Sequence, residues 1–448
     1  MQTNIHPSLN TIPAVNEAED ILRSCVHCGF CTATCPTYQE LNDERDGPRG
    51  RIYLIKQFLE TGTLTEASRK HLDRCLSCRS CETTCPSGVQ YGRLLDIGRS
   101  LAEQHLPRNH QSRLVRWGLR QILPHPKRFK LLLNTGQIFK PLLSEKLKQK
   151  IPPKRQSALW PSNSHKRVML ILDGCVQPAT SPNTNISAAR VLDKLGISLI
   201  TAPKAGCCGA VSQHLSADHE ALNFMRKNID AWWPAIEGRI EAGVEAGVEA
   251  RVETRAEAIV ITTSGCGVTV QEYGHLLKDD PAYAHKAKKV SELCKDISQV
   301  LMEEDLTPLK LANTQDNKTG DQEKETNNKT NKGHSSKTAL HCPCSLQHGM
   351  QQTGNGNKAN IEQILQRAGI ELAKTKDSHL CCGSAGTYSI LQPELSQKLL
   401  ENKLKALTLE QPVQIVTGNI GCQLHLESQS PVPVKHWIEL LSDILQRT

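Results

Sequence analysis

Aromatic side chains and long apolar runs are scarce in this sequence of 448 residues. Phe, Trp and Tyr together make up 4% of the chain. Apolar runs such as residues 168–172 are far shorter than the roughly 20 residues that a membrane span requires. Residues 1–20 are polar and lack the basic-then-apolar pattern of a secretory signal peptide. With 22% charged residues and a mean hydropathy of -0.41, the sequence predicts a globular, cytoplasmic protein.

Nucleotide-binding motifs are also missing. The sequence contains neither a G-x-G-x-x-G segment after a strand-like run nor a G-x-x-x-x-G-K-[ST] segment. Nothing therefore marks a flavin or nicotinamide site, and the removal of a hydride from a substrate would require a cofactor on another chain.

Cysteine, in contrast, is abundant, with 18 residues that are mostly clustered. Disulfides are rare in a reducing cytoplasm, so clustered thiols indicate metal binding or redox chemistry. Eight of them form two copies of the pattern Cys-x2-Cys-x2-Cys-x3-Cys-Pro, which begin at Cys25 and Cys75. This spacing is typical of ferredoxin-type [4Fe–4S] clusters, whereas structural zinc usually takes two Cys-x2-Cys pairs separated by a longer loop.

The spacing also suggests which thiols share a cluster. Three cysteines two residues apart wrap the chain around one corner of a cluster, and in two-cluster proteins the fourth cysteine binds the other cluster. The expected ligands are Cys25, Cys28, Cys31 and Cys85 for cluster 1, and Cys75, Cys78, Cys81 and Cys35 for cluster 2. His27 and Arg79 lie between ligands, and we interpret them as spacers.

A repeated pattern occupies the rest of the chain. Residues 166–302 and 338–446 each contain an apolar run leading to a cysteine, an amphipathic stretch, a Cys-Cys-Gly and a β-like run ending in Gly-Cys. Each closes with a stretch that we interpret as a helix, residues 290–301 and 434–445. The alternation favours α/β units with a parallel sheet. The predicted fold class is mixed, with an N-terminal helical two-cluster ferredoxin-like domain followed by two repeated α/β Cys-Cys-Gly modules.

Each module offers four further cysteines, which are Cys175, Cys207, Cys208 and Cys266 in module one and Cys344, Cys381, Cys382 and Cys422 in module two. We expect each set to gather at one edge of its sheet. The glycine after each Cys-Cys pair would let a backbone N–H approach a sulfur or a ligand, and the glycines beside Cys266 and Cys422 suggest the same device. A third iron–sulfur cluster, zinc, a thiol redox pair and a purely structural site all remain open. His348 and His425 are interpreted as solvated or supporting groups, and Cys294 and Cys342 as incidental.

Composition predicts the domain boundaries. They are 1–105 for the two-cluster domain, 106–160 for a basic connector, 166–302 for module one, 313–337 for a disordered linker rich in Asn, Lys, Thr and Gly, and 338–448 for module two. Module one also contains an insertion, residues 241–258, with glutamate at every fourth position. We interpret this tract as exposed and without chemistry.

Positive charge is concentrated in the connector. The formal net charge of the chain is +8, but residues 106–155 alone hold thirteen Lys or Arg residues and a single acid, Glu145. This predicts a docking face for an acidic partner or an anionic membrane surface. Only Trp117, Phe129 and Phe139 could stack on bases there, which argues against a nucleic-acid partner.

Two ferredoxin motifs followed by two Cys-Cys-Gly modules resemble the iron–sulfur subunits of membrane-associated flavin dehydrogenases. The glycolate oxidase iron–sulfur subunit family is the most similar, through residues 47–56, 174–178, 264–268 and 343–348. The similarity covers nearly the whole chain outside residues 241–258 and 313–337.

The resemblance implies an electron-transfer subunit that is not catalytic alone. FAD-containing glycolate oxidase subunits would oxidise glycolate to glyoxylate, and this chain would pass the electrons towards a quinone-type acceptor, in the cytoplasm or at the inner face of the membrane. The alternative is the same role in a D-lactate or glycerol-3-phosphate dehydrogenase. Related Cys-Cys-Gly proteins hold unusual clusters, but Thr269 and His425 stand where a final Cys-x-x-Cys would end each module.

Overall fold

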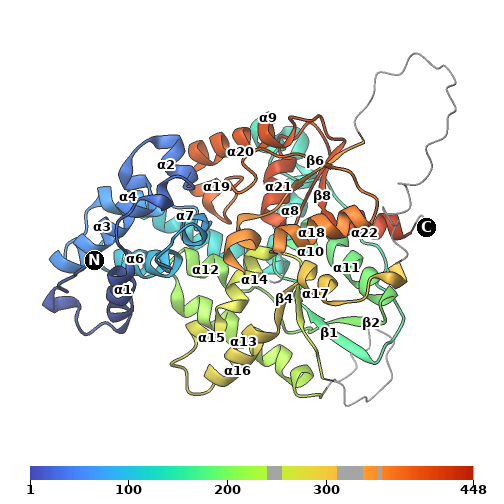
Figure 1. Ribbon diagram of the computed structural model, residues 1–448, viewed down its shortest axis with the longest axis horizontal. Helices are drawn as coiled ribbons and strands as arrows, with labels where there is room; N and C mark the ends of the chain where they lie inside the picture. Colours follow the sequence, from blue (N-terminus) through green and yellow to red (C-terminus); the bar gives the residue numbers. More distant parts are fainter. Residues whose placement is uncertain (240–254, 310–335, 351–355, 447–448) are drawn as a thin grey trace.

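The computed structural model describes residues 1–239, 255–309, 336–350 and 356–446. A helical N-terminal region, blue in Figure 1, packs against two α/β modules, which run from green to red. Each module is built on a four-stranded parallel sheet. The mixed fold class expected from the sequence is therefore confirmed, while the domain boundaries stay a prediction.

The N-terminal region is a set of short helices around a core of its own. Its elements are η1 (Pro7–Leu9), α1 (Pro13–Ser24), η2 (Phe30–Thr32), α2 (Pro36–Leu41), η3 (Glu44–Asp46), α3 (Pro48–Thr61), α4 (Glu66–Asp73), α5 (Ser80–Thr83) and α6 (Tyr91–His105). Proline opens α1, α2 and α3, where its fixed φ suits the first turn and no N–H is needed. Leu22, Ile55 and Leu94 are buried where α1, α3 and α6 meet. The first two cysteines of each motif lie between helices, after α1 and after α4, and the third lies in the next short helix, η2 or α5.

The basic connector forms α7 (His110–Ile122), α8 (Pro126–Ile138), η4 (Lys140–Leu142) and α9 (Glu145–Lys148). Pro124 and Pro126 separate α7 from α8 because proline cannot continue a helix. Neither α7 nor α8 contains a buried residue. No helix in the part of the chain that the structure describes is long and apolar enough to cross a membrane.

Module one has the sheet order β2-β1-β3-β4, and all its strand pairs are parallel. Its elements are β1 (Arg167–Ile171), α10 (Gln177–Thr180), α11 (Asn183–Lys194), β2 (Ile197–Thr201), α12 (Ala210–His214), α13 (Asp218–Ile236), β3 (Ile259–Ile261), α14 (Ser264–Gln271), α15 (Tyr273–Leu276), α16 (Ala284–Leu293), β4 (Cys294–Asp296), α17 (Ile297–Glu303) and η5 (Thr307–Leu309).

Module two repeats this topology with the order β6-β5-β7-β8. Its elements are β5 (Thr338–His341), η7 (Ser345–Gly349), α18 (Asn357–Arg367), β6 (Leu372–Ala373), α19 (Tyr388–Leu391), α20 (Pro393–Leu407), β7 (Gln414–Thr417), α21 (Ile420–Glu427), β8 (Val434–His436) and α22 (Trp437–Leu445).

The closing stretches of the two modules differ from the sequence expectation. Residues 290–301 and 434–445 were expected to be helices, but each contains an edge strand, β4 or β8, that leads into a helix, α17 or α22. A side chain at the end of each strand, Asp296 or His436, accepts a hydrogen bond from the first turn of the helix that follows. This cap separates strand from helix, which apolar periodicity alone does not reveal.

The two modules are joined through reciprocal packing. Helix α22 of module two packs against α11 of module one, and α17 of module one packs against α18 of module two. One apolar cluster runs through both sheets and includes Leu170 and Val416. Across the seam, the His436 side chain pairs with the Thr262 carbonyl at 2.8 Å. The modules therefore form one structural unit.

The tract at residues 241–258 is only partly an exposed insertion. Residues 240–254 lie outside the described part, as does most of the predicted linker at 313–337. Ala256 and Ala258, however, are 6% and 2% exposed. The Ala256 N–H donates to the Ala235 carbonyl at 2.9 Å, and the Glu257 N–H donates to the Val168 carbonyl at 3.0 Å. The end of the tract is thus the lead-in to β3, and the expectation that all of it is exposed is wrong.

Two deletions test this boundary. Removing residues 241–254 should leave the melting temperature close to that of the full chain. Removing residues 241–258 should lower stability by about 1–3 kcal/mol, because buried backbone groups lose their partners and two buried alanines are lost. Thermal unfolding of both variants provides the measurement. Equal stability of the two deletions would show that residues 255–258 contribute nothing to module one.

Candidate metal centres

The first cavity in the N-terminal region is lined by the cysteines expected to bind cluster 1. Cys25, Cys28 and Cys31 come from the first motif, and Cys85 reaches the same cavity from the second motif, just after α5. The last cysteine of the first motif, Cys35, lines the other cavity instead.

The second cavity is lined by Cys75, Cys78, Cys81 and Cys35, which is the set expected for cluster 2. Cys81 also borders the first cavity, so the two sites adjoin. The structure thus brings each expected set together and crosses the fourth cysteine between the motifs, which is the arrangement typical of two-cluster ferredoxins.

In both motifs, residues between the cysteines adopt left-handed backbone conformations. His27 and Ser77 occupy equivalent places and have φ values of 57° and 52°. Gly29 and Arg79, two residues further on, have φ values of 84° and 59°. Such conformations are costly for side-chain-bearing residues, so the loop geometry is held by its surroundings. His27 is interpreted as a spacer between ligands. Arg79 in addition joins the N-terminal region to module one, because its guanidinium forms an ion pair with Glu272.

A buried arginine lies beside the second cavity. Arg51 is 1% exposed and lines that cavity. It donates to the His71 carbonyl at 2.7 Å and to Thr37 Oγ1 at 3.1 Å, and it pairs with Asp46 at 3.5 Å. Asp46 also pairs with Arg74 at 2.8 Å, so the Asp46 carboxylate belongs to an ion-pair network and is not available as a metal ligand.

Polar groups also lie against the sulfurs of the second cavity. The Tyr91 hydroxyl donates to Cys75 Sγ at 3.6 Å, the Ser77 N–H donates to the same sulfur at 3.4 Å, and Thr37 Oγ1 lies 3.3 Å from Cys35 Sγ. Hydrogen bonds to ligand sulfurs tune the reduction potential of an iron–sulfur cluster. Neither Arg51 nor these donors could be singled out from the cysteine spacing.

The thiols of the first cavity repel one another when they ionise. Burial raises the pKa of the Cys31 thiol to about 11, and the neighbouring Cys25 adds to the increase. A metal bound by thiolates reverses this effect, since a coordinating thiol is deprotonated outright. The donor set of four thiols at each cavity, all buried or half-buried except the exposed Cys28, therefore fits an iron–sulfur cluster.

Each module gathers its own four cysteines beyond the carboxyl ends of its strands. In module one the side chains contact one another in the order Cys175, Cys207, Cys208 and Cys266. In module two the order of contacts is Cys344, Cys381, Cys382 and Cys422. The repeat predicted from the sequence thus produces two equivalent thiol groups. All eight are free cysteines.

The glycine after each Cys-Cys pair has the expected role. Gly209 and Gly383 have φ values of 95° and 88°. Their N–H groups donate to Cys207 Sγ and Cys381 Sγ, each at 3.4 Å. A Cβ on Gly383 would lie 2.7 Å from the Ser396 carbonyl oxygen, so both space and conformation require glycine.

The glycines near Cys266 and Cys422 serve other purposes, so the expectation of the same device there is wrong. Gly267 packs against Met350 of module two, where a Cβ would lie 2.5 Å from the Met350 sulfur. The Gly421 N–H donates to Asn419 Oδ1 at 2.8 Å. These glycines allow close packing and helix capping.

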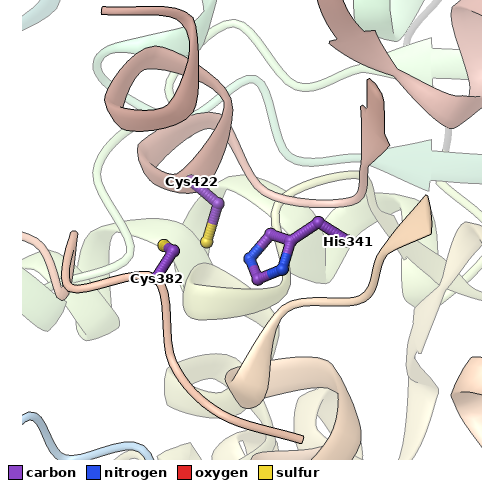
Figure 2. A group of neighbouring side chains, drawn as sticks. All are labelled: His341, Cys382 and Cys422. Carbon is purple, nitrogen blue, oxygen red and sulfur yellow. The ribbon is translucent and has the colours of Figure 1, made fainter. Parts of the chain in front are cut away.

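The histidines differ in their surroundings. His425 lies 3.2 Å from Ser396 Oγ, and His348 lies 2.9 Å from Thr83 Oγ1, so both have polar partners away from the thiols. Burial lowers the pKa of His425 to about 4. His341, which motif spacing did not indicate, lies closest to the thiols of module two, beside Cys382 and Cys422 (Figure 2). Cys294 and Cys342 are buried, 2% exposed each.

The second cavity adjoins module two. Cys78 and Cys344 both pack against a small apolar cluster that includes Leu76, Cys381 and Tyr388. The Tyr388 hydroxyl donates to the Arg74 carbonyl at 2.9 Å, which joins the two parts of the chain. The thiols expected to bind cluster 2 therefore lie next to the thiols of module two.

Comparisons with known proteins agree with this arrangement. The family described as "4Fe-4S dicluster domain" matches residues 21–89, and the family described as "Cysteine-rich domain" matches residues 169–271 and 338–427. The chain is 49% identical, over 448 residues and the full length of both sequences, to the glycolate oxidase iron–sulfur subunit of Escherichia coli strain K12. The chain belongs to the family of glycolate oxidase iron–sulfur subunits.

More distant relatives extend the comparison. A probable glycolate oxidase iron–sulfur subunit of Bacillus subtilis is 27% identical to this family member, covering 91% of the chain and 89% of the relative. Lactate utilization protein A of Bacillus subtilis is 21% identical and covers 60% of the chain and 96% of the relative.

The crossed arrangement of the fourth cysteines can be tested by spectroscopy. The C85S and C28S variants should lose the same electron paramagnetic resonance signal, because Cys85 and Cys28 line one cavity. The C35S and C78S variants should lose the other signal. The control is C294S, which should retain both signals. If C85S instead lost the signal that C78S loses, each motif would hold its own cluster and the crossed assignment would be wrong.

Proposed function

We propose that this chain is the electron-transfer subunit of a glycolate-oxidising complex. FAD-containing subunits would oxidise glycolate to glyoxylate, releasing two electrons and two protons, and this subunit would pass the electrons towards a quinone-type acceptor. The observation that carries the proposal is the arrangement of eight cysteines around two adjoining cavities, in a chain 49% identical over its whole length to a glycolate oxidase iron–sulfur subunit. Bound at these thiols, [4Fe–4S] clusters supply one-electron transfer.

The protein's own residues prepare the two sites differently. At the first cavity Cys28 is exposed, and the neighbouring Val26 and Phe30 are 68% and 61% exposed. At the second cavity all four cysteines are buried or half-buried, Cys78 packs against a cluster shared with module two, and Arg51 is buried at the cavity wall. An exposed apolar rim suits contact with a partner subunit, whereas a buried cation stabilises negative charge on a reduced centre. We therefore assign the first cavity to the FAD-containing partner.

A second function is supported by a single observation. Lactate utilization protein A matches 60% of this chain at 21% identity, so the same electron-transfer role with a different hydroxy acid, such as D-lactate, is the alternative. Substrate oxidation would take place on the partner subunit in either case.

Activity of the assembled complex tests the function. Co-expressed with its flavoprotein partner, the wild-type chain should support glycolate-dependent reduction of an artificial dye. The C28S and C78S variants should lose at least about tenfold of that rate, because each lacks a ligand at one site. The buried C294S variant is the matched control and should retain the rate. Faster dye reduction with D-lactate than with glycolate would favour the alternative, and full activity of C28S and C78S would overturn the electron-transfer role.

We propose further that α7 and α8 rest on an anionic lipid surface. Several cations of the connector are paired within the chain: Arg108 and Arg116 with Asp73, Arg120 with Glu220, and Arg155 with Glu427. These cations are thus not all available to the docking face that the composition of residues 106–155 predicts. Arg113, Lys127, Arg128 and Lys130 stay exposed on α7 and α8, and neither helix contains an acid.

Large apolar side chains accompany these cations. Trp117, Leu131 and Ile138 are 53%, 69% and 73% exposed, and Leu114, Leu132, Phe139 and Leu142 are exposed as well. Leu131 and Ile138 are two turns apart and share one face of α8. Soluble surfaces rarely expose so many large apolar side chains together. Helices that carry such side chains beside lysine and arginine are typical of proteins that bind at the membrane interface.

Vesicle sedimentation tests the lipid contact. The wild-type chain should bind vesicles that contain phosphatidylglycerol more tightly than vesicles of phosphatidylcholine alone, and more tightly at low salt. The L131Q/I138Q variant should bind at least about tenfold more weakly, because each apolar side chain contributes roughly 1.5–3 kcal/mol when buried. The control is L409Q, at a leucine that is 56% exposed on module two. If L131Q/I138Q bound vesicles normally but no longer co-purified with the flavoprotein, the surface would be a subunit interface instead.

A further inference from the structure

His341 is a buried histidine of module two. It ends β5 and is 2% exposed. Among the described residues, neither of its ring nitrogens has a hydrogen-bond partner. Buried polar atoms are nearly always paired, and an unpaired one requires an explanation such as an ion that binds there.

Two thiols lie beside this ring. A ring nitrogen of His341, Cys382 Sγ and Cys422 Sγ are all within 4.8 Å of one another. Figure 2 shows the ring of His341 directed towards Cys422 and Cys382. The three residues come from different parts of module two: the end of β5, the Cys-Cys-Gly loop and the first turn of α21. Three convergent buried donors from separate elements form a preorganised site.

We propose that His341 is a metal ligand in module two, binding through a ring nitrogen together with the thiolates of Cys382 and Cys422. Imidazole and thiolate together select zinc or iron, either as a single ion or within an iron–sulfur centre. Cys344 and Cys381, which adjoin Cys382 in the chain of thiol contacts, can supply further donors. This proposal extends the metal-binding role considered for the module and does not depend on which hydroxy acid the complex oxidises.

The sheet registers show that module one lacks this ligand. In module one Leu170 is paired with Ile259, and in module two Ala339 is paired with Ile415. These two pairs are equivalent in the repeat, so Leu172 occupies the position of His341. Each residue lies three positions before the first member of its module's group of four thiols, Cys175 or Cys344.

The environment of Leu172 explains why the difference matters. Leu172 is 4% exposed and belongs to the apolar core. A leucine therefore satisfies this position when packing is the only requirement. Placing an imidazole there and leaving both nitrogens unpaired lowers stability unless something binds them. At this strand-edge position module one accordingly offers no nitrogen, whereas module two offers the imidazole of His341.

Such a difference would separate the properties of the two sites. In iron–sulfur centres, replacing thiolate ligands by imidazole raises the reduction potential. A zinc ion bound by two thiolates and an imidazole would not change its oxidation state. In both cases the module-two site would differ from its counterpart in module one, although the two modules share one topology.

The test replaces His341 with the residue found in module one. Wild-type protein and the H341L variant are purified anaerobically, and their iron, zinc and acid-labile sulfide contents are measured. H341L should lose metal from module two, with at least the roughly 10–100-fold drop in affinity seen when even an outer partner of a metal ligand is removed. Both ferredoxin-type signals should remain. The control is H348Q, which should keep the wild-type metal content because His348 pairs with Thr83.

Two further variants keep the proposal open to refutation if H341L folds poorly. H341C supplies a thiolate in place of the imidazole and should retain the metal. If the centre is paramagnetic, this variant should lose the nitrogen hyperfine coupling that the wild-type protein shows, and labelling histidine with ¹⁵N identifies the source of that coupling. C422S should lose the same metal as H341L.

Each of three results would overturn the proposal. The first is wild-type metal content and unchanged spectra in H341L. The second is the absence from wild-type protein of any metal beyond that of the two ferredoxin-type sites. The third is a module-two centre that shows no nitrogen coupling in wild-type protein, with zinc and iron contents that are the same in wild-type protein and H341L. If wild-type protein showed no ferredoxin-type signals, that result would instead count against the proposed electron-transfer role.

Discussion

The close approach of buried thiols is the constraint on which the rest of the structure depends. Buried thiols that lie close together cannot all ionise without a compensating positive charge: burial first, and the neighbouring Cys25 second, raise the pKa of Cys31. A protein that gathers them must therefore hold its backbone in place by other means. In the N-terminal region this is done by left-handed residues such as Ser77 and by the ion-pair network around Arg51. In the modules it is done by strands that end at one edge of a parallel sheet.

Much of this could be predicted because thiol chemistry leaves a strong mark on the sequence. Cysteine spacing indicated both ferredoxin motifs, and repetition of Cys-Cys-Gly indicated two α/β modules, whose fold class the structure confirms. What remained hidden depends on contacts between distant residues. The pairing of Arg51 with Asp46 requires the turn at η3, and the position of His341 becomes visible only when β5 is aligned with β1 by its register. From the sequence, residues 255–258 were interpreted as the end of the glutamate-rich tract, but in the structure they hydrogen-bond to the core of module one.

The packing of the three parts gives the two ferredoxin-type sites different surroundings. Tyr388 of module two contacts the N-terminal region, and Arg79 of the N-terminal region contacts module one. Both contacts lie close to the second cavity. The first cavity keeps an exposed rim at Val26 and Phe30. In the described part of the chain, the thiols of the first cavity are therefore more exposed than those of the second.

The modules show how a repeated fold can diverge at equivalent positions while its framework stays constant. Asp296 and His436 both end an edge strand and cap the helix that follows. Burial raises the pKa of Asp296 to about 6, and it accepts hydrogen bonds from Ser298. His436 uses its second nitrogen to pair with Thr262 in the other module. In module one the residue at this position stabilises its own module, and in module two it joins the two modules.

Leu172 and His341 also differ at equivalent positions, at the edge of the sheet. Leu172 fills the apolar core of module one, and His341 turns towards the thiols of module two. Because the register keeps the backbone in place, a single side chain at the end of a strand is enough to change the chemistry of a site.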